Sequence, residues 1–579
     1  MGAWDKTLTR KAQFVDAIKS QLRDNLAGFI ARLSEVQRTL LAESAHQGRL
    51  IGPREFEARH GAPCPMPKRT YDYREEVSLL TAVICTPRYV EQGDPNLAVE
   101  VLTPLRALLP QPAAPRARTL PVLPKFWPSE RQYIGGDRIR PVHVHEGERI
   151  VPAELGRVLR LIHGGKIHVA DASRRPTDAA TRLIGEALVV PDFALEPPKK
   201  EINKFTEAAG PVRAHAWGVL VQQCGWAKPH GGMLKLTAAG QAMLRAFSPE
   251  AFRAGVNAFL GDGEFDELNR VNNLRGQSGK ARQLISEPGV RKFALREAMR
   301  SLPTGEWLDY AEARRMIEAS GEEWDVQTVD DGLLYFSEAK YGVIYDMGGI
   351  NSQFLRALFL ESFATLGLMD VGFVYPHSLW PDFDDSWGHD ARNFCGRYDG
   401  LLYVRINPLG TYALGLVDRY EYRAEPGPKL FRLLPNLEIH LSTEQLNPAD
   451  RAGLELVAVP QDAKLWRLDP VTILTHAESG GALAELESFL EANAAGGLPD
   501  TVCEFFESLH CRVKAFRRSR EAVLLEWETE ELALHLSTDP ATREFCHHAG
   551  GNRLVVPRQQ LTAFRSGVKK LGWVLPTGS

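Results

Sequence analysis

The sequence predicts a mainly α-helical fold with small β elements, an α+β protein built from several domains. Apolar residues recur at helical spacing over long stretches, as at Phe14, Ile18, Leu22 and Leu26. Short apolar runs of strand length, such as residues 166–170, fall between the helical stretches and next to glycine turns. The chain of 579 residues also exceeds the roughly 250 residues at which a single core stops growing, so several cores are expected.

The composition is that of a folded, soluble protein rather than a basic nucleic-acid coat. Hydrophobic residues make up 44% of the chain, charged residues 25%, and the formal net charge is -4. A surface that binds nucleic acid must therefore be a local basic patch. The seven cysteines are scattered without a C-x-x-C pair, which is typical of reduced thiols. No run of about 18 apolar residues and no secretory signal occur, so we expect a cytoplasmic protein that does not enter the membrane.

Two stretches share a degenerate repeat. In residues 212–247 a helical segment ends at Cys224-Gly225, and a glycine hairpin and a strand then lead to Thr237-x-x-Gly. In residues 351–416 a helical segment, a glycine turn and a strand lead to Asn407-x-x-Gly, with an acidic insertion between them. This order resembles winged-helix units, in which a three-helix core carries a small β-ribbon. Counting the helix–strand–helix pattern of residues 151–190, we expect two or three such units in tandem.

Proline-rich stretches and shifts of charge divide the chain into six segments. We expect, in order, an N-terminal helical domain, a proline-rich connector with strands, winged-helix-like units, a basic helical segment, a winged-helix-like unit with an inserted acidic loop, and a C-terminal α+β domain. These cover residues 1–110, 111–150, 151–260, 261–330, 331–428 and 429–579.

The C-terminal segment opens with the short apolar run FRLLPNLEIHL (residues 431–441) and continues with a helix that Asn447 can cap. A helix begins at Asp469-Pro470, and the Leu498-Pro499 step precedes another helix. The ending reads VLLEWETEELALHLSTDPATREF. This succession resembles the helicase-associated domain at the N-terminal end of XPB-type DNA helicases. The resemblance implies an α+β domain that engages DNA or protein partners.

The helicase motor itself is missing from the sequence. A P-loop requires G-x-x-x-x-G-K-[ST], and the nearest stretch has Leu274 in place of the first glycine and Ala281 in place of the hydroxyl residue. No G-x-S-x-G elbow and no H-E-x-x-H helix occur either. We therefore predict no catalytic residue, no cofactor and no bound metal.

Three polar groups leave a metal site open as an alternative. The acidic insertion could chelate a divalent ion and support nuclease chemistry, although a solvated acidic loop is the simpler interpretation. His143 and His145 share one face of a predicted strand, and Cys546 is followed by two histidines, but neither group has a further ligand nearby in sequence. The acidic candidates are Asp382, Asp384, Asp385, His389 and Asp390.

Clusters of arginine and lysine are the candidate DNA contacts, since cations on hairpins and loops can neutralise phosphates. The densest cluster is predicted to form a basic hairpin within residues 511–520, and a second lies in the glycine-containing segment 270–300. Each cluster can equally be a solvated surface. The predicted DNA-binding residues are Arg512, Lys514, Arg517, Arg518, Arg520, Arg275, Lys280, Arg282, Arg291, Lys292, Arg174 and Arg175.

Together these patterns predict a non-catalytic DNA-binding or scaffolding subunit. It would act on double-stranded or forked DNA beside a helicase, another ATPase or a nuclease encoded separately. The process would be repair, transcription, or defence against phages or plasmids. Two alternatives remain: a metal-dependent nuclease that uses the acidic insertion, and a protein-interaction scaffold that does not bind DNA.

Overall fold

The computed structural model confirms a mixed α/β protein in which helices dominate, with about 48% helix, 15% strand and small antiparallel sheets. It describes residues 10–66, 79–85, 96–97, 99–128, 139–196, 209–327, 334–337, 343–344, 347–376, 379, 396–423, 427–514 and 521–576. Within these ranges no helix combines the length and the apolar character needed to cross a bilayer.

The N-terminal region is helical, as the apolar spacing predicts, and has its own core around Leu40, Leu41 and Phe56. Ser34 begins one helix through a capping box with Gln37, so that two backbone N–H groups at its start are satisfied. The elements are α1 (Lys11–Asp24), α2 (Leu26–Ala31), α3 (Glu35–Gln47), α4 (Pro53–His60), η1 (Leu79–Ala82), β1 (Ile84–Cys85), β2 (Asn96–Leu97) and α5 (Val99–Leu108).

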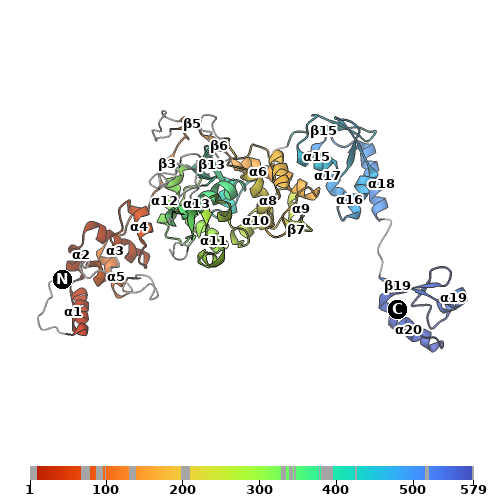
Figure 1. The fold of residues 1–579 in the computed structure, drawn as a ribbon, viewed down its shortest axis with the longest axis horizontal. Helices are drawn as coiled ribbons and strands as arrows, with labels where there is room; N and C mark the ends of the chain where they lie inside the picture. Colours follow the sequence, from red (N-terminus) through yellow and green to blue (C-terminus); the bar gives the residue numbers. More distant parts are fainter. Residues whose placement is uncertain are drawn as a thin grey trace.

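The first unit (residues 147–245) is a helical core with a small sheet (Figure 1). Its strand pair is joined by an isolated bridge between His168 and Met233, which adds a third short strand. The two stretches that the sequence analysis treated as possible separate units thus form one assembly around Leu155, Ile184 and Trp217. Its elements are α6 (Gly147–His163), α7 (Asp178–Ala187), α8 (Arg213–Gln223), β7 (Ala227–His230), β8 (Met233–Leu236) and α9 (Ala238–Arg245).

The second unit (residues 249–413) repeats this order on a larger scale. Helix α13 continues as a π-helix, η7, before the strands, and the sheet has the order β3-β10-β14-β13-β6. The elements are α10 (Pro249–Gly261), η4 (Glu267–Arg270), β9 (Leu274–Arg275), η5 (Gly279–Leu284), α11 (Pro288–Ala298), η6 (Met299–Ser301), β10 (Trp307–Asp309), α12 (Tyr310–Ala319), β11 (Tyr335–Ser337), β12 (Val343–Ile344), α13 (Met347–Ala357), η7 (Leu358–Phe363), β13 (Met369–Phe373), β14 (Leu401–Ile406) and α14 (Pro408–Ala413). The connector contributes β3 (Thr119–Leu120) and β6 (His143–His145) to this sheet, and β4 (Phe126–Pro128) pairs with β5 (Ile139–Pro141).

Hydrogen bonds in the two units show that the repeat extends to atomic detail. The Thr237 hydroxyl accepts from the N–H of Gly240 at 3.1 Å and donates to the carbonyl of Gly225 at 2.7 Å. In the second unit the Asn407 side chain accepts from Gly410 N–H at 2.8 Å and donates to the carbonyl of Gly367 at 2.9 Å. The same polar clasp therefore fixes the strand-to-helix corner in both units.

A glycine is required inside each clasp because the backbone of a neighbouring segment passes too close for a side chain. A Cβ on Gly240 would lie 1.9 Å from the carbonyl oxygen of Trp226, and one on Gly410 would lie 1.8 Å from that of Leu368. The Thr/Asn-x-x-Gly pattern of the sequence thus has a single packing reason in both copies.

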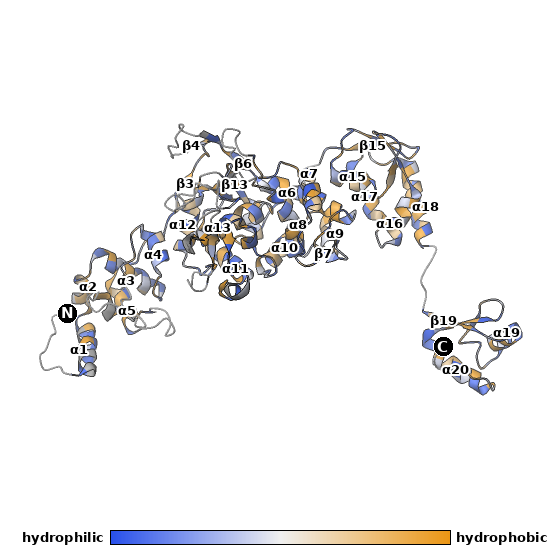
Figure 2. Ribbon diagram, in the orientation of Figure 1, coloured by the Kyte–Doolittle hydropathy of each residue, from blue (hydrophilic) through white to orange (hydrophobic). Residues whose placement is uncertain are grey.

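The third unit (residues 429–514) places helices on one face of a four-stranded antiparallel sheet of order β15-β16-β18-β17 (Figure 1). Hydrophobic and hydrophilic residues alternate along its helices (Figure 2), as expected when one helix face covers a core. The elements are β15 (Phe431–Leu433), β16 (Glu438–Leu441), α15 (Pro448–Leu454), β17 (Ala458–Pro460), β18 (Leu465–Leu468), α16 (Pro470–Glu478), α17 (Leu483–Asn493) and α18 (Asp500–Lys514).

The C-terminal unit (residues 521–576) has a separate core around Leu536, Leu554 and Phe564. The segment predicted as one C-terminal domain therefore contains two hydrophobic cores. The elements are β19 (Ala522–Glu526), α19 (Glu530–Thr538), β20 (His547–His548), β21 (Arg553–Pro557), η10 (Arg558–Gln560) and α20 (Leu561–Lys570), with strand order β19-β21-β20.

Candidate nucleic-acid-binding surface

The four-stranded sheet of the third unit turns one face to the core and leaves the other open. Side chains alternate along each strand, so Phe431 and Leu433 of β15 are buried while Arg432 between them is exposed. In β16, Ile439 and Leu441 are buried and His440 is exposed. In β18, Trp466 and Leu468 are buried and Arg467 is exposed. Helices α15–α18 supply the apolar side chains that pack against the buried side of the sheet.

The strand register brings these exposed residues together on one surface, which we call the open sheet face (Arg432, Glu438, His440, Val459 and Arg467). Arg432 lies opposite His440, Glu438 opposite Arg467, and Arg467 opposite Val459. Residues opposite each other in antiparallel strands have Cβ atoms about 4.5–5.5 Å apart. Arg432 on β15 and Arg467 on β18 therefore flank β16, which carries His440 and Glu438 on the same face.

The charge of this face is predominantly positive. The single carboxylate, Glu438, lies 3.7 Å from the imidazole of His440 and is half-buried. Neither Arg432 nor Arg467 forms an ion pair within the part of the chain that the structure describes. Two guanidinium groups that face solvent without a protein partner can bind phosphate oxygens, alone or bidentately. The face carries no aromatic side chain, so its chemistry suits contacts to the sugar–phosphate backbone rather than base stacking.

The predicted basic hairpin has a different structure. Arg512 and Lys514 occupy the last turn of helix α18 and are exposed, where positive charge also complements the helix dipole. The expectation of a hairpin over these two residues is wrong, because the amphipathic helix that covers the sheet continues through them. Arg517, Arg518 and Arg520 lie outside the described residues.

The second predicted cluster is divided between the surface and the core. Arg275 and Arg282 are exposed, and the side chain of Lys280 is outside the described part. Arg291 and Lys292, by contrast, have no exposed surface. As buried groups they cannot reach a phosphate, so Arg291 and Lys292 are not DNA contacts in this structure.

Buried acids explain why Arg291 and Lys292 turn inward. The Arg291 guanidinium donates to Asp266 at 2.7 Å and stacks 4.5 Å from the ring centroid of Phe354. The Lys292 ammonium lies 4.0 Å from Glu267 and 4.5 Å from the Phe259 ring centroid. Buried cations require a partner charge or aromatic face, and both residues find them within one packed unit.

The remaining predicted pair lies beside the first unit's third helix. Arg174 is exposed, adopts a left-handed backbone conformation (φ 54°) and pairs with Glu264. Arg175 is half-buried, and burial together with the nearby charge of Arg270 lowers its pKa. Arg174 thus carries a neutralised charge and Arg175 faces the junction between the first and second units.

That junction covers the helices that precede the hairpins. Almost every residue of α8 is buried, and α8 packs against η7 of the second unit. Glu361 of η7 accepts hydrogen bonds from Arg270, whose Nε lies 3.3 Å from both carboxylate oxygens, and from the hydroxyl of Tyr398. Burial alone would raise the pKa of Glu361, but the charge of Arg270 and the Tyr398 hydrogen bond help to lower it overall. Glu361 is therefore a buried carboxylate of the second unit that holds Arg270 in place, and Arg270 in turn donates to the carbonyl of Pro211 in the first unit at 2.7 Å.

The histidine and cysteine candidates have structural surroundings. Burial and the charge of Arg213 lower the pKa of His145 to about 3, while His143 is exposed on the same strand. Cys546 is buried and its thiol donates to backbone carbonyls, and burial raises its pKa to about 11. Among the described residues neither group meets two further potential metal ligands. The acidic insertion, with Asp382, Asp384, Asp385, His389 and Asp390, lies outside the described residues.

A scan against protein-family models finds none that matches this chain, and a search of curated proteins finds no match either. The functional assignment therefore depends on the chain's own chemistry. The open sheet face was missed in the sequence because each strand is only three or four residues long. The available signal was the alternation Phe-Arg-Leu, Ile-His-Leu and Trp-Arg-Leu, which places a basic residue between two buried ones in three strands.

Proposed function

We propose that this protein is a non-catalytic DNA-binding and scaffolding subunit that acts beside a separately encoded helicase, ATPase or nuclease. The observation that carries the proposal is the open sheet face, on which Arg432 and Arg467 present unpaired guanidinium groups in a chain whose net charge is -4. Two unpaired arginines against one glutamate, Glu438, give this face a local positive charge on an otherwise acidic protein, which suits a polyanion-binding surface.

The organisation of the first and second units supports a scaffolding role. The first unit has the helix–strand–helix–helix–hairpin order of winged-helix domains. The second follows this order from α11 to β14, with the strand pair β11–β12 inserted between α12 and α13. These orders support the tandem winged-helix interpretation. In that fold the third helix usually reads the major groove. Here α8 is buried against η7, so base readout by this helix is not available in this arrangement. We therefore propose contacts to the DNA backbone without sequence specificity, with the joined units holding partner surfaces in a fixed geometry.

The order of elements in the third unit also supports the resemblance to the helicase-associated domain of XPB-type helicases. A resemblance to that domain without the motor is consistent with a partner in trans that supplies ATP hydrolysis or cleavage. Double-stranded and forked DNA are the substrates that such a partner would process.

The test is fluorescence anisotropy of the full chain with duplex, forked and single-stranded DNA across a salt series. Binding should weaken as salt rises, with a logarithmic slope of about -0.9 for each phosphate contacted on duplex DNA. Removing two phosphate contacts by Arg432→Ala with Arg467→Ala should make the slope shallower by about 1.8.

A matched control removes the same charge elsewhere. Arg553 and Arg558 are also exposed, but each pairs with a glutamate, Glu526 at 3.0 Å and Glu521 at 3.1 Å. Arg553→Ala with Arg558→Ala should leave the slope unchanged. An equal change in both double variants would refute a specific role for the open sheet face.

A second candidate is a protein-interaction scaffold that does not bind DNA. The burial of α8 favours it, because the helix most often used for DNA recognition is used here for packing between units. This candidate predicts no anisotropy change with any of the three DNAs at low salt, and that outcome would replace the first proposal.

A further inference from the structure

Two histidines and a glutamate from different units converge where the first and third units meet. His163 lies in the last turn of α6, His476 on α16 and Glu485 on α17. One potential ligand atom from each of the three lies within 4.8 Å of the other two. The imidazole rings of His163 and His476 meet edge to face with centroids 5.0 Å apart. Among the described residues this is the one cluster of three or more such groups within that distance.

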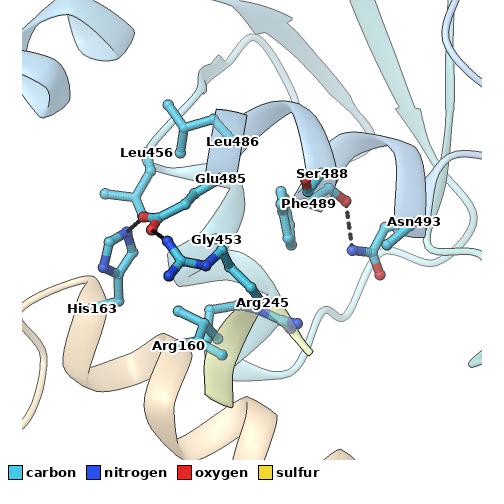
Figure 3. A pocket seen from close by; sticks show the side chains of 12 residues that line it. Arg160, His163, Arg245, Gly453, Leu456, Glu485, Leu486, Ser488, Phe489 and Asn493 are labelled. Carbon is cyan, nitrogen blue, oxygen red and sulfur yellow. Dashed lines mark hydrogen bonds and ion pairs between the residues drawn. The ribbon is translucent and has the colours of Figure 1, made fainter. Parts of the chain in front are cut away.

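The glutamate is held so that one oxygen remains available. Arg245 donates to Oε1 of Glu485 at 2.9 Å, while Oε2 lies 4.0 Å from Nε2 of His163 (Figure 3). A separation of 4.0 Å is too long for a hydrogen bond, so the carboxylate and the imidazole do not satisfy each other. Arg245 thus orients Glu485 in the way that an outer hydrogen-bond partner orients a metal ligand.

One imidazole nitrogen of the cluster lacks a partner among the described residues. The Nε2 atom of His476 is buried without a hydrogen-bond partner. A buried unsatisfied nitrogen in a polar cluster points to a missing ligand. Such a nitrogen on a neutral imidazole is the atom through which a histidine binds a metal ion.

A glycine makes room for this histidine. A Cβ on Gly481 would lie 2.0 Å from Nε2 of His476, so any larger residue would displace the ring. Gly480, the residue before it, has φ 96° and ends the turn that leads from α16 towards α17. Gly480 therefore permits the turn between the two helices, and Gly481 leaves space for the His476 ring.

We propose that His163, His476 and Glu485 bind one divalent transition-metal ion of the zinc class. Two neutral imidazoles and one carboxylate form a ligand set typical of zinc, with water in the fourth position. Ligand atoms about 2.0–2.1 Å from zinc lie roughly 3.4 Å apart in a tetrahedral site. The three ligand atoms here lie within 4.8 Å of one another, so they must approach by up to about 1.4 Å. The side chains of His163 and Glu485 are 14% and 12% exposed, so rotation of the ligand side chains within the joint would have to bring these atoms together.

The ion would cross-link the first and third units, because His163 belongs to the first unit and His476 and Glu485 belong to the third. The joint already contains ion pairs between α6 or its following turn and the third unit, including Lys166 with Glu455 at 2.8 Å and Arg160 with Asp450. A metal ion with ligands on both sides adds a link that charge pairs alone do not provide. The inference is independent of DNA binding, since none of its ligands lies on the open sheet face.

The test is isothermal titration of the full chain, first treated with chelator, with ZnCl₂ and separately with CoCl₂. We expect one equivalent of metal and a cobalt absorption spectrum of nitrogen and oxygen ligands. His163→Ala and His476→Ala should each weaken binding at least about 100-fold. Arg245→Gln should weaken it about 10-fold, because outer-shell partners typically contribute 10–100-fold.

The matched control is His510→Ala. His510 also pairs with a glutamate, Glu487 at 2.8 Å, but has no second imidazole beside it. This variant should bind zinc as the unmodified chain does, and its circular dichroism should match that of His163→Ala. No zinc binding by the unmodified chain, full binding by His163→Ala and His476→Ala, or a thiolate band in the cobalt spectrum would each overturn the proposal.

Discussion

Replacing Glu361 by alanine should loosen the junction between the first and second units. Glu361 is a buried carboxylate that pairs with Arg270 and accepts from Tyr398. Breaking a buried pair by removing one partner typically costs about 3–5 kcal/mol, because the other charge stays buried without compensation. Arg270 is only 15% exposed, so little of its charge can be solvated after the change. We therefore expect a loss near this range in the free energy of opening of the junction.

Native-state hydrogen exchange of the α8 amides measures this free energy locally. Since about 1.4 kcal/mol corresponds to a factor of ten, protection of α8 should fall by about two to four orders of magnitude in Glu361→Ala. Glu264→Ala is the control, because Glu264 pairs with Arg174 where both side chains are about half exposed. Such a surface pair contributes at most about 1 kcal/mol. If the two variants lose similar protection in α8, the reasoning about the buried junction is wrong.

The pH dependence of stability should reveal His215, because burial and the charge of Arg270 lower its pKa to about 4. Between pH 6.5 and 4 this histidine takes up a proton in the unfolded chain but not in the folded one, so acidification should lower the free energy of unfolding by roughly 3 kcal/mol. His215→Asn should remove this part of the pH dependence, measured by urea unfolding at a series of pH values. An unchanged pH dependence in the variant would contradict this. Gly240→Ala and Gly410→Ala should each destabilise their unit by about 3 kcal/mol through contact with a backbone carbonyl, measured by thermal unfolding. Gly156→Ala is the control, because nothing lies within 4 Å of the added Cβ, and it should be neutral or stabilise by about 0.5–1 kcal/mol. Equal losses of stability at Gly156, Gly240 and Gly410 would refute the claim that the two corners require glycine.

Local sequence patterns were sufficient to predict the helical segments and the repeated corner. The glycine turn and the Thr237 and Asn407 caps depend on neighbours close in the chain, so their residue types indicate the geometry directly. The assembly of the first unit was less accessible. It depends on a strand around His168 that pairs with Met233. These residues are far apart in the sequence, and the local spacing of apolar residues does not indicate such a pairing.

Residue charge alone could not predict which basic side chains are exposed and which are buried. Arg291 and Arg282 look alike in sequence, yet the first pairs with Asp266 in the core and the second is exposed. Whether a cation faces water depends on which acid the fold brings to it. The open sheet face was missed for a related reason, because strands of three or four residues give too few alternations to assign a face.

Site-specific photocrosslinking tests the central claim of DNA binding by the open sheet face most directly. A photoreactive residue at Val459, which is 37% exposed and lies opposite Arg467 on this face, should crosslink to duplex or forked DNA. The same residue at Leu534, which is 52% exposed on the C-terminal unit, should crosslink much less. Crosslinking at Val459 that disappears in Arg432→Ala with Arg467→Ala is the result that we predict. Equal crosslinking at both positions, or none at Val459 under conditions where the protein binds DNA, would contradict the proposal.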